Sequence, residues 1–121
     1  KMYDDKNIFA KILRKEIPCE PIYEDDKVLF IHDLYPQAKV HILGIPKIPV
    51  VDFLDFITKS SREEVQHFFW KIQDLIKEFG IDQSGFKIIM NSGDHGGQEI
   101  PHFHAHILGG QNLQTLSNST L

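Results

Sequence analysis

The sequence lacks the features that would place the chain in a membrane or in an oxidising compartment. It has one cysteine, Cys19, in 121 residues, so the fold stands without an internal disulfide, which fits a reducing cytoplasm. It has no apolar stretch near the ~18 residues that a membrane span requires, and its charged N-terminal residues lack the apolar core of a signal peptide. We therefore expect a cytoplasmic protein without a membrane partner.

A strong excess of charge of either sign is also missing. The formal net charge is −4, with 41% hydrophobic and 25% charged residues, which is typical of a globular protein. Proteins that bind nucleic acid usually carry a basic face, so we expect no nucleic acid partner, although local donors can still hold a small anion. The length of 121 residues predicts a single domain over 1–121.

A row of three histidines is the most informative feature of the sequence. His102, His104 and His106 stand two residues apart, and the residues at 103, 105 and 107 are apolar. Because successive side chains of an extended strand point to opposite faces, this spacing predicts a strand over 101–110 with all the imidazoles on one face. A helix would instead spread the three rings around its axis.

The spacing of the row leaves three interpretations open. The first is chance in a surface strand. The second is a metal site, because histidines on one strand face can bind zinc; against it, Glu99 is the only acidic residue or cysteine near the row in sequence. The third is nucleophilic catalysis, in which a neutral imidazole attacks an electrophile while its neighbours orient it and move protons.

The remaining pattern predicts an α+β fold, with an antiparallel sheet of about five strands packed against a long helix and an N-terminal helix. The N-terminal helix is expected over about 7–16, capped by Asn7 and ended before Pro18. The long helix is expected over about 61–79, opened by a capping box and stopped at Gly80. Strands are expected over 22–24, 28–32, 40–45 and 86–91 in addition to the histidine row, and 51–58 is expected to be irregular with a helical turn.

The sequence resembles the histidine triad (HIT) family, and within it the HINT branch. The family signature, His-x-His-x-His followed by two apolar residues, matches residues 102–108. Further motifs match in the family's order: Asn7 to Pro18, Tyr23-Glu24-Asp25-Asp26, His32-Asp33, Pro36-Gln37-Ala38, His41 to Lys47, Asn91-Ser92-Gly93 and Gly96-Gly97-Gln98. The resemblance covers about residues 7–110, and so many motifs in one order make it specific.

This resemblance implies a HIT-like fold and the activity of a purine nucleoside phosphoramidase. Such an enzyme cleaves the P–N bond of a nucleoside 5′-phosphoramidate through a covalent nucleotidyl-histidine intermediate and releases AMP or GMP. The resemblance implies His104 as the nucleophile, oriented by the carbonyl of His102, and His106 as the group that assists the leaving amine. His102 and a buried His41 complete the catalytic network. The resemblance implies no metal or other cofactor. It does imply a homodimer.

The resemblance also assigns residues to the substrate. It implies that Asp33 accepts hydrogen bonds from the ribose hydroxyls, since a carboxylate with two oxygens suits a cis-diol. It places Asn91 at the ribose and phosphate, and Gly97, Gln98 and Glu99 at the phosphate, where small residues let backbone N–H groups approach an anion. The apolar residues assigned to the substrate are Ile8, Phe9, Ile12, Ile17, Ile31 and Leu34.

The chain departs from the family pattern in several places. Pro49 stands where members commonly have a histidine, and Glu99 stands where many eukaryotic members have a serine. Because a carboxylate repels phosphate, we expect Glu99 to turn aside and leave its backbone N–H as the donor. The polar tail 111–121 does not match the short eukaryotic ending.

Three alternative functions remain beside the phosphoramidase. One is a dinucleoside polyphosphate hydrolase of the same superfamily, against which the Gly96-Gly97-Gln98 and Leu108-Gly109-Gly110 segments favour the HINT branch. Another is a nucleotide-binding scaffold with little turnover. The last is a zinc hydrolase. A chelator would inactivate a zinc hydrolase, whereas a HIT enzyme would keep its activity.

Overall fold

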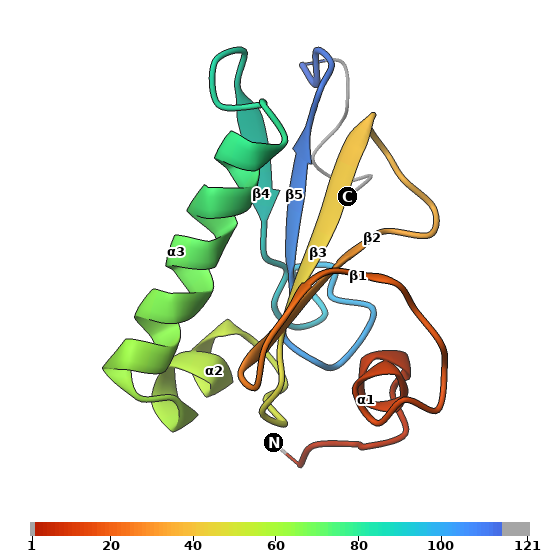
Figure 1. The fold of residues 1–121 in the computed structure, drawn as a ribbon. Coiled ribbons are helices and arrows are strands. Elements are labelled where there is room, and N and C mark those ends of the chain that lie inside the picture. The colour runs from red at the N-terminus through yellow and green to blue at the C-terminus, as the bar shows by residue number, and fades with distance from the viewer. Residues whose placement is uncertain (1, 115–121) are drawn as a thin grey trace.

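In a computed structural model, residues 2–114 are described and form a five-stranded antiparallel sheet with helices on both faces (Figure 1). The strands are β1 (Pro21–Glu24), β2 (Val28–His32), β3 (Val40–Pro46), β4 (Phe86–Ile89) and β5 (Ala105–Gly109), in the spatial order β1-β2-β3-β5-β4. The helices are α1 (Ile8–Leu13), α2 (Phe53–Lys59) and α3 (Arg62–Glu78). The predicted α+β fold is confirmed. Of the tail predicted over 111–121, residues 115–121 lie outside the described part.

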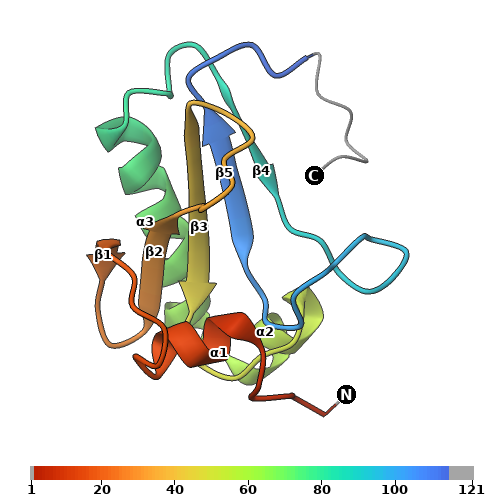
Figure 2. The ribbon, with the colours of Figure 1, turned by 90° about the vertical axis from the view of Figure 1, so that its right-hand side faces the viewer.

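The alternation of strand side chains gives the sheet two apolar faces. One face packs against α2 and α3, where Phe30 of β2 and Ile107 of β5 join the largest buried cluster. On the other face, Phe9 and Ile12 of α1 pack against a smaller cluster from β2 and β3, which contains Leu29, Ile31, Leu43 and Ile45. Figure 2 shows α1 on one side of the sheet and α3 on the other.

The long helix α3 begins and ends close to the positions that the sequence predicted. The N–H of Glu64 donates to Ser61 Oγ at 3.0 Å, and the N–H of Ser61 donates to the Glu64 carboxylate at 2.8 Å, which completes the capping box. Phe79 caps the C-terminal end, and Gly80 follows with a φ of 69°. The predicted bounds of about 61–79 therefore agree with Arg62–Glu78.

Helix α1 is shorter than the predicted span of about 7–16 and ends at Leu13. Its start is as expected, because the Ala10 N–H donates to the Asn7 side chain at 2.9 Å. At the other end, Lys15 adopts a left-handed φ of 65°, and the N–H groups of Lys15 and Glu16 donate back to the carbonyls of Ile12 and Lys11. This pair of bonds is a Schellman ending. Here a lysine occupies a position that usually holds glycine, so the sequence did not indicate that the helix ends at this point.

Two other segments differ from the sequence prediction. The segment 51–58, expected to be irregular, contains the helix α2, whose N-cap Asp52 accepts from the Asp55 N–H at 3.0 Å. The histidine row pairs as a strand only from Ala105 onward, because the N–H of Phe103 donates to the Val50 carbonyl at 2.9 Å instead of to a strand. The predicted alternation nevertheless holds: residues 103, 105 and 107 all join the cluster beneath α3.

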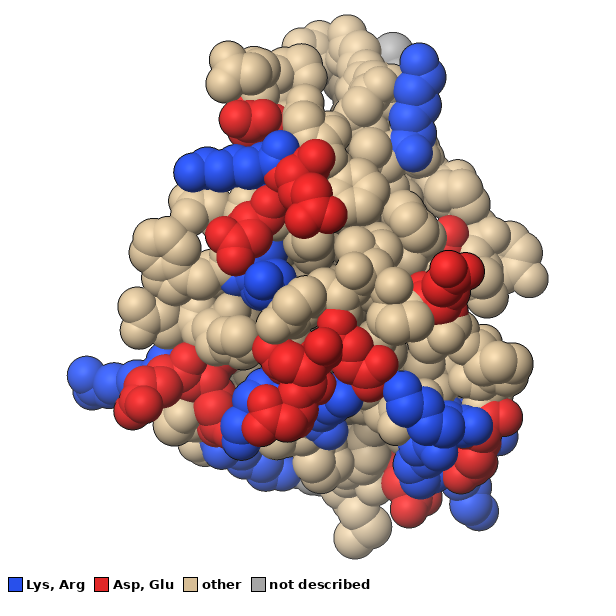
Figure 3. Space-filling model, in the orientation of Figure 1, with Lys and Arg blue, Asp and Glu red and all other residues tan. Residues whose placement is uncertain are grey.

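The surface of the described residues carries mixed charge. On the face drawn in Figure 3, acidic and basic side chains lie next to one another, most densely over its lower half. Among residues 2–114, no helix has the length and apolar character that crossing a membrane requires.

Candidate active site

A cavity of about 820 Å³ lies on the α1 side of the sheet. Its walls come from α1, the end of β2, the loop that follows β2, the loop between β4 and β5, and the rings of His41, His104 and His106. This volume suits a small-molecule ligand. Three of the four histidines assigned to catalysis from the sequence therefore meet at one cavity.

His104 is held in a single orientation. Its side chain is buried, and its Nδ1 lies 2.7 Å from the carbonyl oxygen of His102. Because a carbonyl only accepts, Nδ1 carries the hydrogen, and Nε2 retains its lone pair. The Phe9 ring packs edge-on against the imidazole with centroids 4.8 Å apart. The hydrogen bond from His104 to the His102 carbonyl, expected from the sequence, is confirmed.

The charge state of His104 follows from its surroundings. Burial lowers its pKa, while the hydrogen bond to His102 and the charge of Asp33 act in the opposite direction. A lowered pKa keeps the imidazole neutral near pH 7. His104 thus offers an unprotonated Nε2 at the cavity.

A backbone N–H sets the tautomers of His41 and His106. The N–H of Gln37 donates to His41 Nδ1 at 3.0 Å, so the hydrogen of neutral His41 sits on Nε2. That Nε2 lies 2.9 Å from His106 Nδ1, which must therefore accept, and the hydrogen of His106 is left on Nε2. The Asp33 carboxylate lies 3.4 Å from the same His41 nitrogen. The chain of bonds ends with His106 as a donor.

Both histidines of this chain are held neutral. Burial, together with repulsion from His104 and His41, lowers the pKa of His106 to about 4 against the opposing charge of Asp33. Burial also lowers the pKa of His41, against the opposing charge of Asp33. The predicted position of His41, buried beside the triad, is confirmed.

The ring of His102 is fully buried and, like that of His41, is hydrogen-bonded at both nitrogens. Its Nε2 lies 2.8 Å from the Pro46 carbonyl oxygen, so that nitrogen donates. Its Nδ1 lies 2.6 Å from the hydroxyl of Tyr3, so that nitrogen accepts. Burial lowers the pKa of His102 to about 4, partly opposed by the bond to Pro46. His102 thus contacts His104 through its backbone carbonyl.

Most residues assigned to the substrate from the sequence line the cavity. They are Ile8, Phe9, Ile12, Ile31, Asp33, Leu34, Asn91, Gly97 and Glu99. Ile17 does not lie with them, because the chain turns at Lys15 and Ile17 packs against the cluster beneath α1.

Gln98, also assigned to the phosphate, is committed to the loop itself. Its side-chain amide donates to the carbonyls of Val51 at 2.7 Å and Ile100 at 3.0 Å, and its oxygen accepts from the Gly93 N–H at 3.0 Å. These bonds use the amide group to fasten the loop onto the start of α2. Gln98 is absent from the cavity walls formed by the described residues.

The loop before β5 depends on its glycines. The Asn91 amide donates to the Gly96 carbonyl at 2.7 Å, which closes the loop. A Cβ at Gly96 would lie 2.2 Å from the Ser92 carbonyl oxygen, and Gly97 has a φ of 74°, so neither position accepts a larger residue without strain. His95 is exposed, yet it lines the cavity together with Asp94.

Several residues that line the cavity or contact the histidines were given no role from the sequence. Tyr35 and Gln37 lie on the loop after β2, and the proton-setting N–H of Gln37 is a backbone group that any residue other than proline supplies. Tyr3 is far from His102 in sequence, and only the packing of the N-terminal segment brings them together.

The structure also weakens the sequence argument against a metal. Asp33, His41 and His106 each offer one ligand atom, and these atoms lie within 4.8 Å of one another. Asp33 therefore supplies the carboxylate that the row lacks in sequence. His41 Nε2 and His106 Nδ1 already share a 2.9 Å hydrogen bond, which a zinc ion bound at these two nitrogens would have to replace.

The fold and the histidine cavity define a protein of the histidine triad class. The chain belongs to the HIT domain family, whose model matches residues 14–113. It is 48% identical over 118 residues to a HIT-like protein of Rickettsia prowazekii, covering 98% of both chains. It is 37% identical over 109 residues to the purine nucleoside phosphoramidase of Escherichia coli K12, covering 90% of this chain and 91% of the relative.

Solved structures agree with this membership. A histidine triad protein from Clostridium difficile has 41% identity and a TM-score of 0.81, with 96% of this chain and 100% of the other covered. A HIT family hydrolase from Legionella pneumophila Philadelphia 1 has 31% identity and a TM-score of 0.83, with 91% of this chain and 97% of the other covered. The predicted HIT-like fold is confirmed.

Proposed function

We propose that this protein hydrolyses the P–N bond of purine nucleoside 5′-phosphoramidates through a covalent nucleotidyl-His104 intermediate. The observation that carries the proposal is the bond from His104 Nδ1 to the His102 carbonyl, which leaves the lone pair of Nε2 at the cavity. The similarity to the phosphoramidase of E. coli supports the choice of a P–N substrate.

In the first step, His104 Nε2 attacks the α-phosphorus and forms a P–N bond to the imidazole. The bond to the leaving nitrogen breaks, and that nitrogen keeps the electron pair. It also takes one proton, delivered at His106 Nε2, the nitrogen that the chain from Gln37 leaves as the donor. The product amine departs, and the nucleotide remains on His104.

In the second step, water attacks the phosphorus, one of its protons returns to His106 Nε2 to replace the proton given to the amine, and the bond to His104 breaks. The imidazole leaves with its electron pair and is again neutral, and the nucleoside monophosphate is released. Over the cycle, one water supplies a proton to the amine and a hydroxyl to the phosphate, so atoms and charge balance. Because the nucleophile must be neutral in each cycle, the lowered pKa of His104 favours turnover near pH 7.

The cavity suggests how the nucleotide binds. We assign the purine to the apolar walls, which include Ile8 and Phe9 of α1 and Leu34 of the loop after β2. We assign the ribose to Asp33, whose Oδ1 already accepts from the Tyr35 N–H at 2.8 Å. A carboxylate has about four lone-pair positions, so this bond leaves capacity for the ribose hydroxyls.

The phosphate is assigned to the glycine-rich loop and to Asn91. The N–H groups of Gly97 and Gln98 already donate to the carbonyls of Asp94 and Gly93, at 3.1 and 3.0 Å. We therefore assign the Glu99 N–H, and not these two, to the phosphate. The Glu99 side chain is exposed at the cavity, so it can turn toward water.

We also propose a homodimer that forms along β4. This strand lies at one edge of the sheet, and its Phe86 and Ile88 side chains are 43% and 38% exposed. An edge strand offers backbone donors and acceptors to a second copy, and a two-fold axis would pair β4 with itself. A cytoplasmic location remains part of the proposal, and the free, exposed Cys19 is compatible with it.

The test of this function is release of AMP from adenosine 5′-phosphoramidate in the presence of a chelator, with His104→Ala as the control. The proposal predicts chelator-resistant release that the control lacks. Cleavage of dinucleoside polyphosphate with no cleavage of the phosphoramidate would favour the other enzymatic branch. Tight AMP binding without turnover would favour a scaffold. Activity that disappears with chelator and returns with zinc would contradict a metal-free mechanism and point to Asp33, His41 and His106.

A further inference from the structure

Tyr3 makes a contact with the histidine triad for which the proposed chemistry has no use. Its hydroxyl lies 2.6 Å from His102 Nδ1, and the two rings meet edge to face with centroids 5.6 Å apart at 74°. Burial raises the pKa of Tyr3. His102 Nε2 donates to the Pro46 carbonyl, so the neutral ring accepts at Nδ1 and the phenol is the donor.

The segment that carries Tyr3 is fixed to α1. The Asn7 amide and N–H both donate to the Asp4 carbonyl, at 2.8 and 3.4 Å, while the Asn7 oxygen caps α1. This turn holds residues 4–7 against the helix. Phe9, one turn further on, packs edge-on against both His102 and His104, at 6.3 and 4.8 Å between centroids. The N-terminal segment thus contacts two consecutive histidines of the triad.

His102 transmits this contact to the nucleophile. Its ring is clamped between Tyr3 at Nδ1 and the Pro46 carbonyl at Nε2, so neither a ring flip nor a change of tautomer keeps both bonds. Its backbone carbonyl accepts from His104 Nδ1 at 2.7 Å. The direction of that carbonyl sets the direction of the His104 lone pair, and the carbonyl follows the backbone that the clamped ring anchors.

We propose that Tyr3 is a positioning residue for the reaction, acting through His102 to hold His104 in its attacking orientation. Tyr3 does not touch the substrate: the cavity walls formed by the described residues do not include it. The inference rests on the proposed function for its kinetic consequence, but its structural half, a locked His102 tautomer, stands without any activity.

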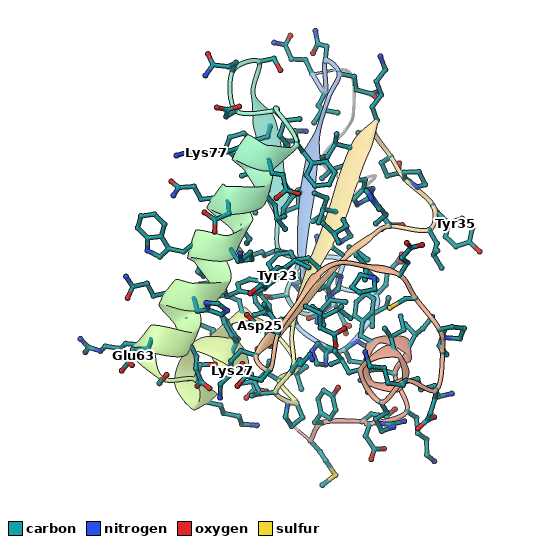
Figure 4. The ribbon with its side chains drawn as sticks, viewed as in Figure 1. Tyr23, Asp25, Lys27, Tyr35, Glu63 and Lys77 are labelled. Carbon is teal, nitrogen blue, oxygen red and sulfur yellow. The ribbon has the colours of Figure 1, made fainter. Side chains whose placement is uncertain are left out.

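The chain offers a matched control, since Tyr23 also donates its hydroxyl to a side chain. Its partner is Asp25 at 2.8 Å, and Figure 4 shows this pair between the β1–β2 hairpin and α3, away from α1. Tyr3→Phe and Tyr23→Phe each remove one hydroxyl, and with it the bond to His102 in the first case and to Asp25 in the second. Comparison of the two separates positioning of the triad from general loss of stability.

The kinetic test compares both variants with the parent protein on adenosine 5′-phosphoramidate. A small displacement of a nucleophile slows the chemical step but leaves the affinity for substrate nearly unchanged. Tyr3→Phe should therefore lower kcat about tenfold and change KM less than about twofold. Tyr23→Phe should leave both parameters within about twofold of the parent. In a His102→Leu background, where the phenol has lost the imidazole, Tyr3→Phe should change kcat by less than about twofold.

The structural test uses nuclear magnetic resonance of ¹⁵N-labelled imidazoles and needs no substrate. In the parent protein, His102 should show one tautomer with hydrogen on Nε2, and His104 one with hydrogen on Nδ1. In folded Tyr3→Phe, the His102 Nδ1 resonance should move and the His104 tautomers should become mixed, whereas Tyr23→Phe should leave both unchanged. Thermal unfolding of each variant establishes the fraction folded.

The possible outcomes separate this inference from the proposed function. Tyr3→Phe with the parent's kcat and unchanged His102 and His104 signals would overturn it, as would equal effects of Tyr3→Phe with and without His102. A loss of kcat that matches only the unfolded fraction would also overturn it. If the parent protein has no phosphoramidase activity but the tautomer changes occur, the positioning role is supported and the proposed function fails.

Discussion

The two faces of the sheet use the same strands for opposite purposes. Toward α3, β5 presents Ala105 and Ile107, and the surrounding cluster is apolar throughout. Toward α1, β5 and the residue before it present His106 and His104, and four buried or half-buried imidazoles interrupt a smaller apolar cluster. Burying a polar ring is costly unless its nitrogens are bonded. Apolar packing on the α3 face offsets this cost in stability, and the α1 face holds the histidines and the cavity.

The largest effect is expected from His104, the proposed nucleophile on the α1 face. His104→Ala should lower kcat about 10⁴-fold or more, because no other group takes over the attack, while the free energy of unfolding changes by only about 1–2 kcal/mol. Release of AMP and chemical denaturation measure the two quantities on one sample. A variant that retains more than a tenth of the parent's kcat would show that His104 is not the nucleophile.

The complementary variant lies on the α3 face. Phe68 is fully buried and its ring contacts those of Phe30, Phe56 and Phe103, so Phe68→Ala should lower the free energy of unfolding by about 3–5 kcal/mol. At a temperature where it is folded, its kcat per folded molecule should match that of the parent. A selective loss of kcat without loss of stability would break the division between the faces.

The tautomer chain can be broken at its first bond. Gln37→Pro removes the N–H that donates to His41 Nδ1, which frees His41 to carry its hydrogen there and to accept at Nε2. His106 then loses its defined donor nitrogen, and kcat should fall about tenfold. Gln37→Ala keeps the N–H and is the matched control for the side chain. Equal rates in the two variants would rule out the chain as the device that sets the His106 tautomer.

The buried histidines should make stability depend on pH. The pKa values of His102 and His106 lie near 4 in the folded protein and near 6.5 when exposed. Between these values the unfolded chain binds protons that the folded protein does not, so stability should fall as the pH falls from about 6.5 to about 4. The loss should be about 1–3 kcal/mol for each histidine. Urea unfolding across this window measures it, and His106→Asn should flatten the curve.

The smallest effect on the monomer is expected at the sheet edge. Ile88→Lys should leave the fold and the rate per active site nearly unchanged, because the side chain is 38% exposed. If β4 forms a dimer interface, the charge should shift the protein from dimer to monomer. Sedimentation at several concentrations measures the shift. A dimer that survives this substitution would place the interface away from β4.

Local sequence rules predicted the parts of the fold that depend on neighbours in the chain. The alternation around His104 correctly divided β5 and the residues before it between two faces, and the Ser61 to Glu64 spacing located the start of α3. The early end of α1 was missed because Lys15 occupies a left-handed position without glycine.

The parts of the site that were missed depend on contacts distant in sequence or on backbone groups. Neither the approach of Tyr3 to His102 nor that of Asp33 to His41 leaves a local pattern. The N–H of Gln37 carries no residue preference except the exclusion of proline. The residue types in the sequence therefore indicated the candidate catalytic histidines, and only the fold revealed the groups that orient them.

The most direct test of the account is to locate the covalent intermediate. Protein mixed with adenosine 5′-phosphoramidate is quenched within a turnover, digested under conditions that preserve histidine–phosphorus bonds, and its peptides are sequenced by mass spectrometry. The account predicts one adenylyl group on His104, absent from His104→Ala. An adduct on His102 or His106, or AMP release with no adduct at any time, would contradict it.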